Sequence, residues 1–128
     1  MKIAKQLVFL VTAGCISLAA AASAQTHPMV GKWREKISHT GDVDLVITGI
    51  GPDGLITGTF EVPRYSGWNC TFSDRVDPTQ KLATGKVNGE ALFVTLANGT
   101  TYDLKLEDGM LVGMARGGRT WPMRFRRQ

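Results

Sequence analysis

The stretch around position 40 holds three residue types that can perform nucleophilic catalysis. Ser38, His39 and Asp42 supply a hydroxyl, an imidazole and a carboxylate, which acyl-transfer enzymes combine. Adjacent side chains of a strand point to opposite faces, so Ser38 and His39 are not expected to meet at one substrate. The chain also has no G-x-S-x-G, H-E-x-x-H, P-loop or C-x-x-C motif. We therefore expect no catalytic residues and no enzyme activity.

Asp42 and Asp44 form a second group that could do chemistry. Their spacing puts both carboxylates on one side of a strand, where they could hold a hard cation. Calcium takes 6–8 oxygen ligands, and no further ligands can be located in the sequence. The alternative is a solvent-facing start of a strand. We predict no metal site and no cofactor.

The two cysteines, Cys15 and Cys70, are the remaining reactive side chains. A catalytic thiol needs a histidine partner, and the chain offers only His27 and His39. Once an N-terminal signal has been removed, Cys70 stands alone and cannot form an intramolecular disulfide. We expect Cys70 to be buried, as free cysteines usually are. The chain must then be held together by its core or by assembly, and a homo-oligomer of unknown order fits the second option.

The first 24 residues have the pattern of an export signal. A basic start precedes an apolar run over residues 7–22, and the Ala-Ser-Ala before Gln25 fits the small-x-small cleavage rule. The apolar run is too short and lacks the flanks of a permanent membrane span. We expect residues 1–24 to be a signal peptide and residues 25–128 to be one domain, periplasmic or secreted by a bacterium.

A second interpretation of the N-terminus rests on the segment V-T-A-G-C that ends at Cys15. It resembles a bacterial lipoprotein signal with Cys15 as the lipidated residue. Against it, Thr12 stands where such signals usually have Leu, and the sequence after Cys15 stays apolar. Cleavage before Gln25 is the favoured prediction.

The charge of the domain is modest. The formal net charge falls from +4 to +2 when the two lysines of the signal are removed, which argues against a nucleic-acid binder. The positive charge lies late in the chain. The late arginines are Arg116, Arg119, Arg124, Arg126 and Arg127. A solvated face of the last two strands is the favoured interpretation, and a phosphate or membrane patch is the alternative.

Turn signals divide the chain into short segments. Asn-Gly and Asp-Gly pairs supply the positive φ angles that two-residue hairpin turns require. The signals are G-P-D-G at 51–54, Asn88-Gly89, Asn98-Gly99, Asp108-Gly109 and Gly117-Gly118. The last four recur about every ten residues, which is typical of an antiparallel meander.

Between the turns, apolar and polar residues alternate, as they do in strands with one face on a core. Examples of inward sets are Val43, Leu45 and Ile47; Trp68, Cys70 and Phe72; Tyr102, Leu104 and Leu106; and Trp121, Met123 and Phe125. Strands are expected near 30–38, 43–50, 55–62, 66–73, 81–87, 90–97, 100–107, 110–116 and 119–126. The predicted fold is all-β, a small antiparallel up-and-down meander barrel of about eight strands, with two packed sheets as the alternative.

Two motifs resemble the avidin family and, more loosely, the lipocalin-like calycins. The Gly-x-Trp that ends at Trp33 looks like the start of the first avidin strand, and D-G-L-I-T-G-T-F at 53–60 looks like the second hairpin. The resemblance covers residues 30–62. It implies a ligand-holding barrel in which Trp33 plugs the closed end.

The resemblance does not imply biotin binding. Avidins place an Asn two residues after the motif Trp, and this chain has Glu35. The later Ser corresponds to Ser38 or His39, and the Tyr that ends the second motif is Phe60. Because an unpaired buried polar group costs about 1–3 kcal/mol, several such changes remove most of the affinity.

The aromatic residues either fill the barrel or line a cavity at its open end. Burying large rings is how a small domain without disulfides becomes stable, so the core interpretation has the stronger general support. Pockets in barrel mouths are mainly apolar, with a few polar groups. The candidate ligand-binding residues are Glu35, His39, Phe60, Tyr65, Trp68 and Arg116.

Two functions follow from these observations. The first is an exported, non-enzymatic barrel that binds a small apolar or amphipathic molecule. The alternative is a protein-interaction module, such as a periplasmic hydrolase inhibitor or an envelope assembly factor, in which the late arginines or the loop at 63–67 make the contact.

Overall fold

The computed structural model describes residues 27–37, 41–63 and 68–128. Their regular elements are nine strands. These are β1 (Gly31–Ile37), β2 (Gly41–Ile50), β3 (Ile56–Glu61), β4 (Cys70–Phe72), β5 (Leu82–Asn88), β6 (Ala91–Thr95), β7 (Thr101–Glu107), β8 (Met110–Gly117) and β9 (Arg119–Arg127). The bounds lie close to the predicted ones except at β4, where the described part of the expected strand at 66–73 is reduced to Cys70–Phe72; positions 66 and 67 lie outside the described residues.

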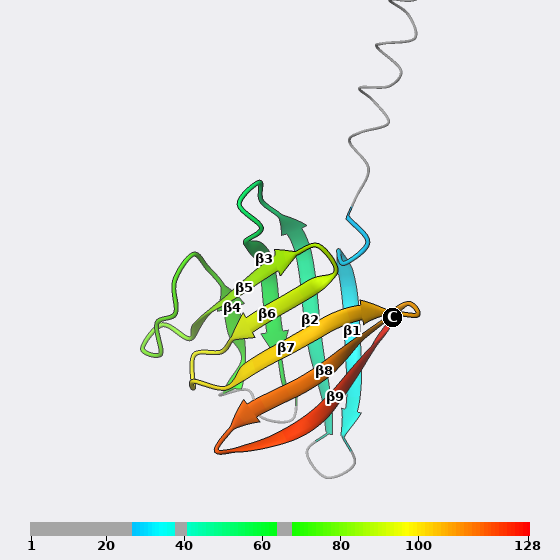
Figure 1. The fold of residues 1–128 in the computed structure, drawn as a ribbon. Coiled ribbons are helices and arrows are strands. Elements are labelled where there is room, and N and C mark those ends of the chain that lie inside the picture. Colours follow the sequence, from blue (N-terminus) through cyan, green and yellow to red (C-terminus); the bar gives the residue numbers. More distant parts are fainter. Residues whose placement is uncertain (1–26, 38–40, 64–67) are drawn as a thin grey trace, which may run out of the picture.

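The strands form a closed barrel in sequence order, and β9 returns to pair with β1 (Figure 1). The prediction of an all-β up-and-down barrel is therefore confirmed, and the alternative of two packed sheets is wrong. A closed ring leaves no long exposed edge, which is how a meander of short strands avoids pairing with other chains.

The short strand β4 explains how nine strands can close. Strand directions around a closed ring must return to their start, so the number of antiparallel pairs has to be even. Among the described residues, β4 pairs with β5 in parallel and every other neighbouring pair is antiparallel. At the other end of β3, Leu55 bridges directly to Lys86 of β5, so β4 widens the ring at one end only.

The expected positive φ angles occur at Asp108 and at the glycine that ends each predicted turn pair, but not at Asn88, Asn98 or Gly117. Asp108 and Gly109 have φ angles of 51° and 76°, and Gly89 has a φ of 63°. The turn at 51–54 also fastens the barrel, because the Gly54 carbonyl accepts a 2.8 Å hydrogen bond from the Val87 amide of β5.

The inward residues form one core cluster to which all nine strands contribute. The predicted alternation is confirmed on β2, where Val43, Leu45 and Ile47 are all at most 4% exposed. Cys70 is also buried, as expected, with its thiol donating to the Trp68 carbonyl at 3.7 Å. Burying apolar surface stabilises a fold by about 25 cal/mol per Å², so this cluster is the main source of stability.

One end of the barrel is filled by Trp33, which is fully buried. Its indole N–H donates to the Met29 carbonyl at 2.9 Å, and Met29 itself is buried. The guanidinium of Arg127 lies 4.3 Å from the ring centroid of Trp33 and donates to the carbonyls of Val30 and Pro28. The segment before β1 is thereby held across this end of the barrel, which we call the closed end.

The described residues contain no helix that is long and apolar enough to cross a membrane.

Candidate functional site

The end of the barrel opposite Trp33 contains a cavity of about 1130 Å³, which we call the mouth. Its lining comes from the ends of β1, β3, β6 and β8, the starts of β2, β7 and β9, and the residues beside them. The apolar and aromatic members are Val43, Phe60, Val62, Trp68, Leu96, Tyr102, Trp121, Pro122 and Met123. A cavity of this size and character is suited to a small organic molecule.

The aromatic walls differ in depth. Phe60 and Tyr102 lie at the bottom, with ring centroids 5.2 Å apart in an edge-to-face arrangement. Trp68 stands at the rim, where 60% of its surface is exposed. Trp121 is half-buried between these levels. The mouth therefore leads from an exposed indole at its rim to buried rings at its base.

The hydroxyl of Tyr102 is the most unusual polar group of the mouth. Tyr102 is only 6% exposed, and its hydroxyl forms no hydrogen bond within the described part of the chain. Burial, together with the negative charge of Glu35, raises the pKa of Tyr102 above its ordinary value, so the phenol is neutral at physiological pH. A buried hydroxyl normally has a partner, and leaving it without one costs about 1–3 kcal/mol.

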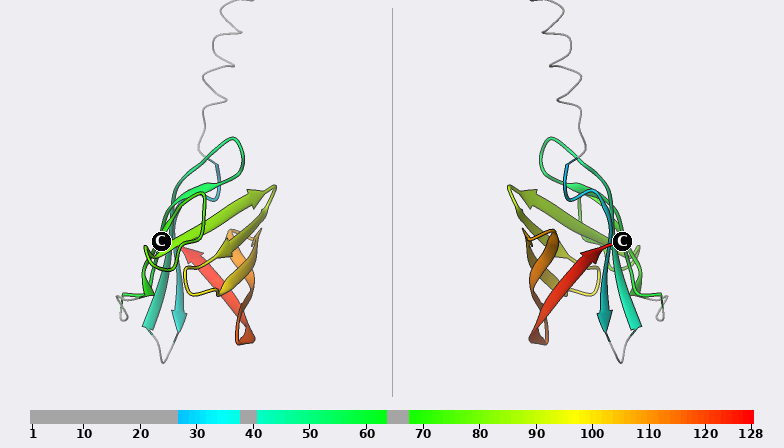
Figure 2. Two further views of the ribbon diagram at one scale, coloured as in Figure 1. Left: turned by 90° about the vertical axis from the view of Figure 1, so that its left-hand side faces the viewer. Right: turned by 90° about the vertical axis from the view of Figure 1, so that its right-hand side faces the viewer.

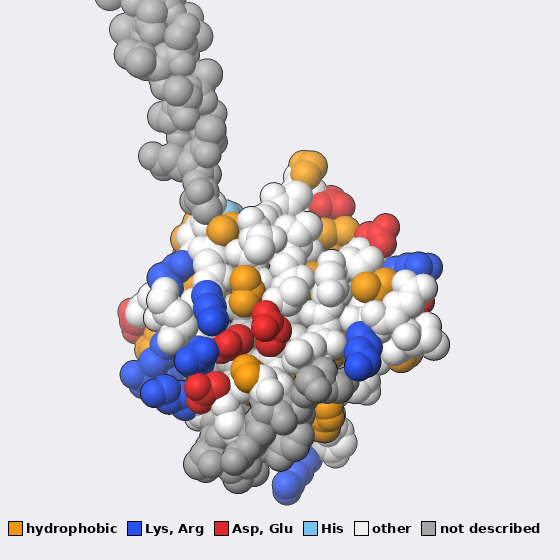
Figure 3. Space-filling view, turned by 180° about the vertical axis from the view of Figure 1, so that it is seen from behind, with side chains coloured by type: hydrophobic (Ala, Val, Ile, Leu, Met, Phe, Trp, Pro, Cys, Tyr) orange, Lys and Arg blue, Asp and Glu red, His pale blue; other side chains and the backbone are white. Residues whose placement is uncertain are grey.

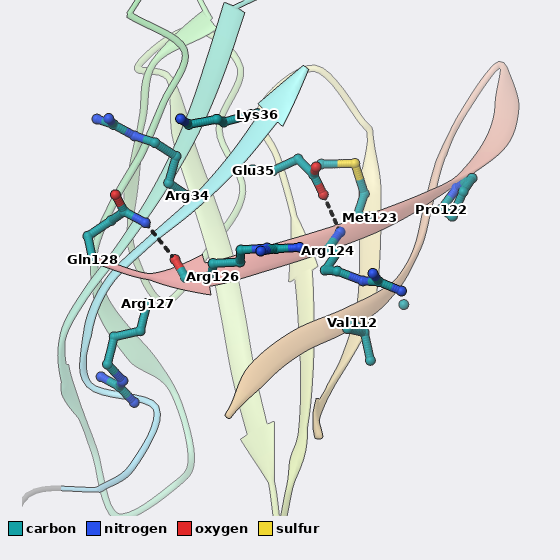
Figure 4. Close-up of a pocket in the computed structure, with 11 residues that line it drawn as sticks. Arg34, Glu35, Lys36, Val112, Pro122, Met123, Arg124, Arg126, Arg127 and Gln128 are labelled. Atoms are coloured by element: carbon teal, nitrogen blue, oxygen red, sulfur yellow. Dashed lines mark hydrogen bonds between the residues drawn. The ribbon is translucent and has the colours of Figure 1, made fainter. Parts of the chain in front are cut away.

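Glu35 supplies the carboxylate of the mouth. The alternation of β1 turns Glu35 inward with Trp33, whereas Arg34 and Lys36 face outward. The Glu35 carboxylate accepts a hydrogen bond from the backbone N–H of Arg124 on β9 (Figure 4). This carboxylate therefore stands where a backbone carbonyl of β1 would otherwise pair with β9.

The seam between β1 and β9 opens at this point. The two strands are in register only at Trp33–Arg127 and Arg34–Arg126, and the Gln128 amide donates to the Lys32 carbonyl at 2.8 Å. On the N-terminal side of this paired stretch, toward the mouth, β9 diverges from β1 (Figure 2). Backbone N–H groups two residues apart on a strand point to the same side, so the nitrogen of Pro122 faces the seam as the Arg124 N–H does. The Pro122 nitrogen has no proton to donate. The strands thus cannot continue to pair.

An open cleft of about 910 Å³ occupies this seam, and we call it the seam cleft. Arg34, Glu35 and Lys36 of β1 line one side. The other side comes from β8 and β9 and the C-terminal residue, namely Val112, Gly113, Pro122, Met123, Arg124, Arg126, Arg127 and Gln128 (Figure 4). The cleft is therefore mixed in character, with arginine side chains beside small apolar patches.

The carboxylates of Asp42 and Asp44 belong to an ion-pair network on the outer face of β1 and β2. Arg34 binds Asp44 through two nitrogens, at 2.7 and 3.0 Å, and lies 3.4 Å from Asp42. The hydrogen bond from Arg34 lowers the pKa of Asp44 despite its burial. The described residues hold no group of three or more His, Cys, Asp or Glu that could bind a metal.

Lys and Arg side chains are mixed with Asp and Glu on one side of the rear surface (Figure 3).

The mouth brings together Glu35, Phe60 and Trp68, three of the residues that the sequence singles out. Arg116 lies exposed on β8 and lines neither the mouth nor the seam cleft. His39 and Tyr65 lie outside the described residues, as does Ser38.

Sequence reasoning did not select Tyr102, Trp121 or Met123 for the site, although all three line the mouth. Each stands at an inward position, Tyr102 and Trp121 near the start of their strands and Met123 in the middle of β9. Alternation predicts an inward side chain but does not tell the core from the open end, which depends on the direction of each strand in the barrel.

Comparison of the chain with protein-family models, with curated proteins and with solved structures gives no match. The fold and the geometry of the mouth are therefore the basis for functional inference.

Proposed function

We propose that this protein is an exported, non-enzymatic β-barrel that binds a small apolar or amphipathic molecule in its mouth. The observation that carries the proposal is the buried Tyr102 hydroxyl, which lines the cavity without a partner among the described residues. A ligand polar group that reached this hydroxyl would remove the free-energy cost of burying it. The aromatic walls would meanwhile bury the apolar part of the ligand.

The resemblance to avidins and lipocalin-like calycins supports this proposal without identifying the ligand. In those barrels one end is closed and the other holds the ligand, and here the motif residue Trp33 is fully buried at the end away from the mouth. Biotin remains a poor candidate. Glu35 and Phe60 occupy positions where avidins have hydrogen-bonding partners for the ureido group, and Phe60 has no hydroxyl to offer.

Export is the second part of the proposal. It rests on residues 1–24, whose basic start, apolar run and Ala-Ser-Ala ending have the form of a signal peptide. Intact-mass measurement of the protein from a bacterial host tests it. Cleavage before Gln25 leaves 128 − 24 = 104 residues, whereas lipidation at Cys15 gives a longer chain with added acyl mass.

Native mass spectrometry of the mature protein, released gently from a bacterial envelope, tests ligand binding. We expect a reproducible additional mass that disappears on denaturation. A bare protein mass that does not change when lipophilic metabolites are added would contradict the proposal. Such a result would favour the protein-interaction module, for which the exposed side chains of Arg116, Arg119 and Arg124 offer a contact surface.

Two variants with similar exposure separate loss of the ligand from loss of the fold. Trp68 lines the mouth and is 60% exposed, whereas Phe93 on β6 is 50% exposed and does not line it. We expect Trp68→Ala to lose most of the bound mass and Phe93→Ala to keep it, with both variants folded by circular dichroism. Equal retention in the two variants would remove Trp68 from the site.

A further inference from the structure

The mouth and the seam cleft adjoin each other. Both are lined by Glu35, Lys36, Pro122 and Met123, which stand where β1 and β9 separate. These four residues therefore form the boundary between the two spaces.

The seam cleft is built into the sequence of the two strands. The Arg124 amide is satisfied by the Glu35 carboxylate, and Pro122 has no amide proton to offer to β1. Proline at the edge of a strand prevents further pairing. The described parts of β1 and β9 are therefore not paired on the mouth side of Arg34 and Arg126, and the seam cleft lies between them.

The outer rim of the seam carries positive charge that no acidic side chain of the described residues neutralises through an ion pair. Lys36 projects from β1 and Arg124 and Arg126 project from β9, and all three side chains are exposed. Within the described part of the chain, none of the three forms an ion pair, whereas Arg34 is bound to Asp42 and Asp44. All three line the seam cleft and are accessible to an anionic group from solvent.

We propose that the ligand is an amphipathic anion. Its apolar chain lies in the mouth against Phe60 and Trp121, and its anionic head group lies in the seam cleft between Lys36, Arg124 and Arg126. This inference rests on the proposed function of the mouth and adds the charge of the ligand and the place of its head group.

Glu35 sets where the head group can lie. Its carboxylate lines both the mouth and the seam cleft, and it would repel an anion that lay beside it in either space. The head group is therefore placed at the outer rim of the seam cleft, away from Glu35. The same charge would attract a cationic ligand into the mouth, where aromatic rings could also contact the cation. The charge of the preferred ligand therefore distinguishes a head group at the rim of the seam from one beside Glu35.

Three probes with the same ten-carbon chain provide the test: decyl phosphate, 1-decanol and decyltrimethylammonium. Their binding to the mature protein is measured by tryptophan fluorescence below the concentrations at which they form micelles. Because exposed ion pairs contribute roughly 0.2–1 kcal/mol each, we expect decyl phosphate to bind about five- to tenfold more tightly than decanol. Decyltrimethylammonium should bind most weakly, and added salt should reduce the advantage of the anion.

Matched arginine variants locate the head group. Arg124→Gln should reduce the advantage of decyl phosphate over decanol to about three- to fivefold, since it removes one of three cations. Arg116→Gln changes the net charge equally, but Arg116 lines neither cavity and the advantage should persist. An equal effect of both variants would show general attraction to a positive protein and would overturn the proposed place of the head group.

The remaining outcomes separate the two proposals. If the three probes bind equally, the mouth binds the chain as proposed, but the inference about charge is wrong. If decyltrimethylammonium binds more tightly than the other two probes and Glu35→Gln abolishes this difference, the ligand is a cation held by Glu35 and the inference about charge is again wrong. If no probe binds and inorganic phosphate does not bind either, both proposals fail.

Discussion

At the scale of single residues, Asp44 shows how a charge can be buried on the outside of a barrel. It lies on the outer face of β2 but is only 4% exposed, because Arg34 and Lys32 of β1 lie over it. Its direct strand partner is Arg34, so the register of β1 and β2 creates the ion pair. The Asp42–Asp44 pattern is thus explained by a strand-to-strand contact.

We expect Asp44→Asn to lower the free energy of unfolding at pH 7 by about 1–3 kcal/mol, because Arg34 loses a charged partner. Asp42→Asn is the control, since its contact with Arg34 is longer, at 3.4 Å, and more exposed. Urea unfolding followed by tryptophan fluorescence measures both. An equal loss in the two variants would contradict the special role of Asp44.

The same carboxylate predicts a pH dependence. The pKa of Asp44 is lowered in the folded protein, so the unfolded chain binds its proton at higher pH than the native state does. The stability from this group is present above the ordinary Asp pKa, about 3.9, and is lost as the pH falls through the native pKa. We expect the wild type to lose more stability than Asp44→Asn between pH 5 and pH 2, as measured by urea unfolding at each pH.

At the scale of strands, Gly58 of β3 shows why the T-G-T-F segment contains glycine. Its φ is +138°, and a Cβ at this position would lie 1.9 Å from the Val46 carbonyl oxygen of the paired strand β2. The pair also contains a bulge between Ile47 and Gly49. Close approach of the two backbones at this point therefore requires a residue without a side chain.

We predict that Gly58→Ala lowers the free energy of unfolding by about 3 kcal/mol or more, through strained backbone angles and the clash with β2. Gly89→Ala is the matched control. Gly89 also has a positive φ, 63°, but a Cβ there would contact nothing within 4 Å, so the cost should be about 1 kcal/mol. Guanidinium unfolding of both variants gives the comparison, and similar losses would show that the contact with β2 is not the cause.

The strands were predictable from the sequence because alternation and turn residues are local properties. Tyr102 and Trp121 stood at correctly predicted inward positions, and Asn-Gly and Asp-Gly pairs marked the turns. The parallel pairing of β4 and the opening of the seam were not predictable in the same way. They depend on which distant strand lies beside Cys70 and on where β9 meets Glu35, which no local pattern encodes.

At the scale of the whole molecule, Arg127 joins the last strand of the barrel to the first strand and to the segment before it. It is the last residue of β9, yet its guanidinium stacks on Trp33 of β1 and donates to carbonyls of the segment before β1. Within the described residues, β1 and β9 are in register at two residue pairs, and the bonds Gln128–Lys32 and Arg124–Glu35 also join them. The Arg127 side chain therefore adds to a short strand contact that lies mainly toward the closed end.

We expect Arg127→Ala to destabilise the protein by about 1–2 kcal/mol, from the loss of the cation–π contact and of hydrogen bonds from a charged donor. Arg126→Ala is the neighbouring control, because the Arg126 side chain is exposed and makes no ion pair within the described residues. Thermal unfolding measures the stability of both variants, and iodide quenching of tryptophan fluorescence measures the increase in Trp33 exposure. A smaller effect for Arg127→Ala than for Arg126→Ala would contradict this account of closure.

The two ends of the described chain leave the barrel beside each other at the closed end, since Gln128 bonds to Lys32 and Arg127 holds residues 28–30 (Figure 1). An affinity tag, a sensor surface or a fusion partner attached covalently at either of these ends would lie next to the closed end of the barrel. The mouth would then point away from the attachment. A C-terminal tag would continue from Gln128, which lines the seam cleft, so it would leave the mouth open but would crowd the cleft.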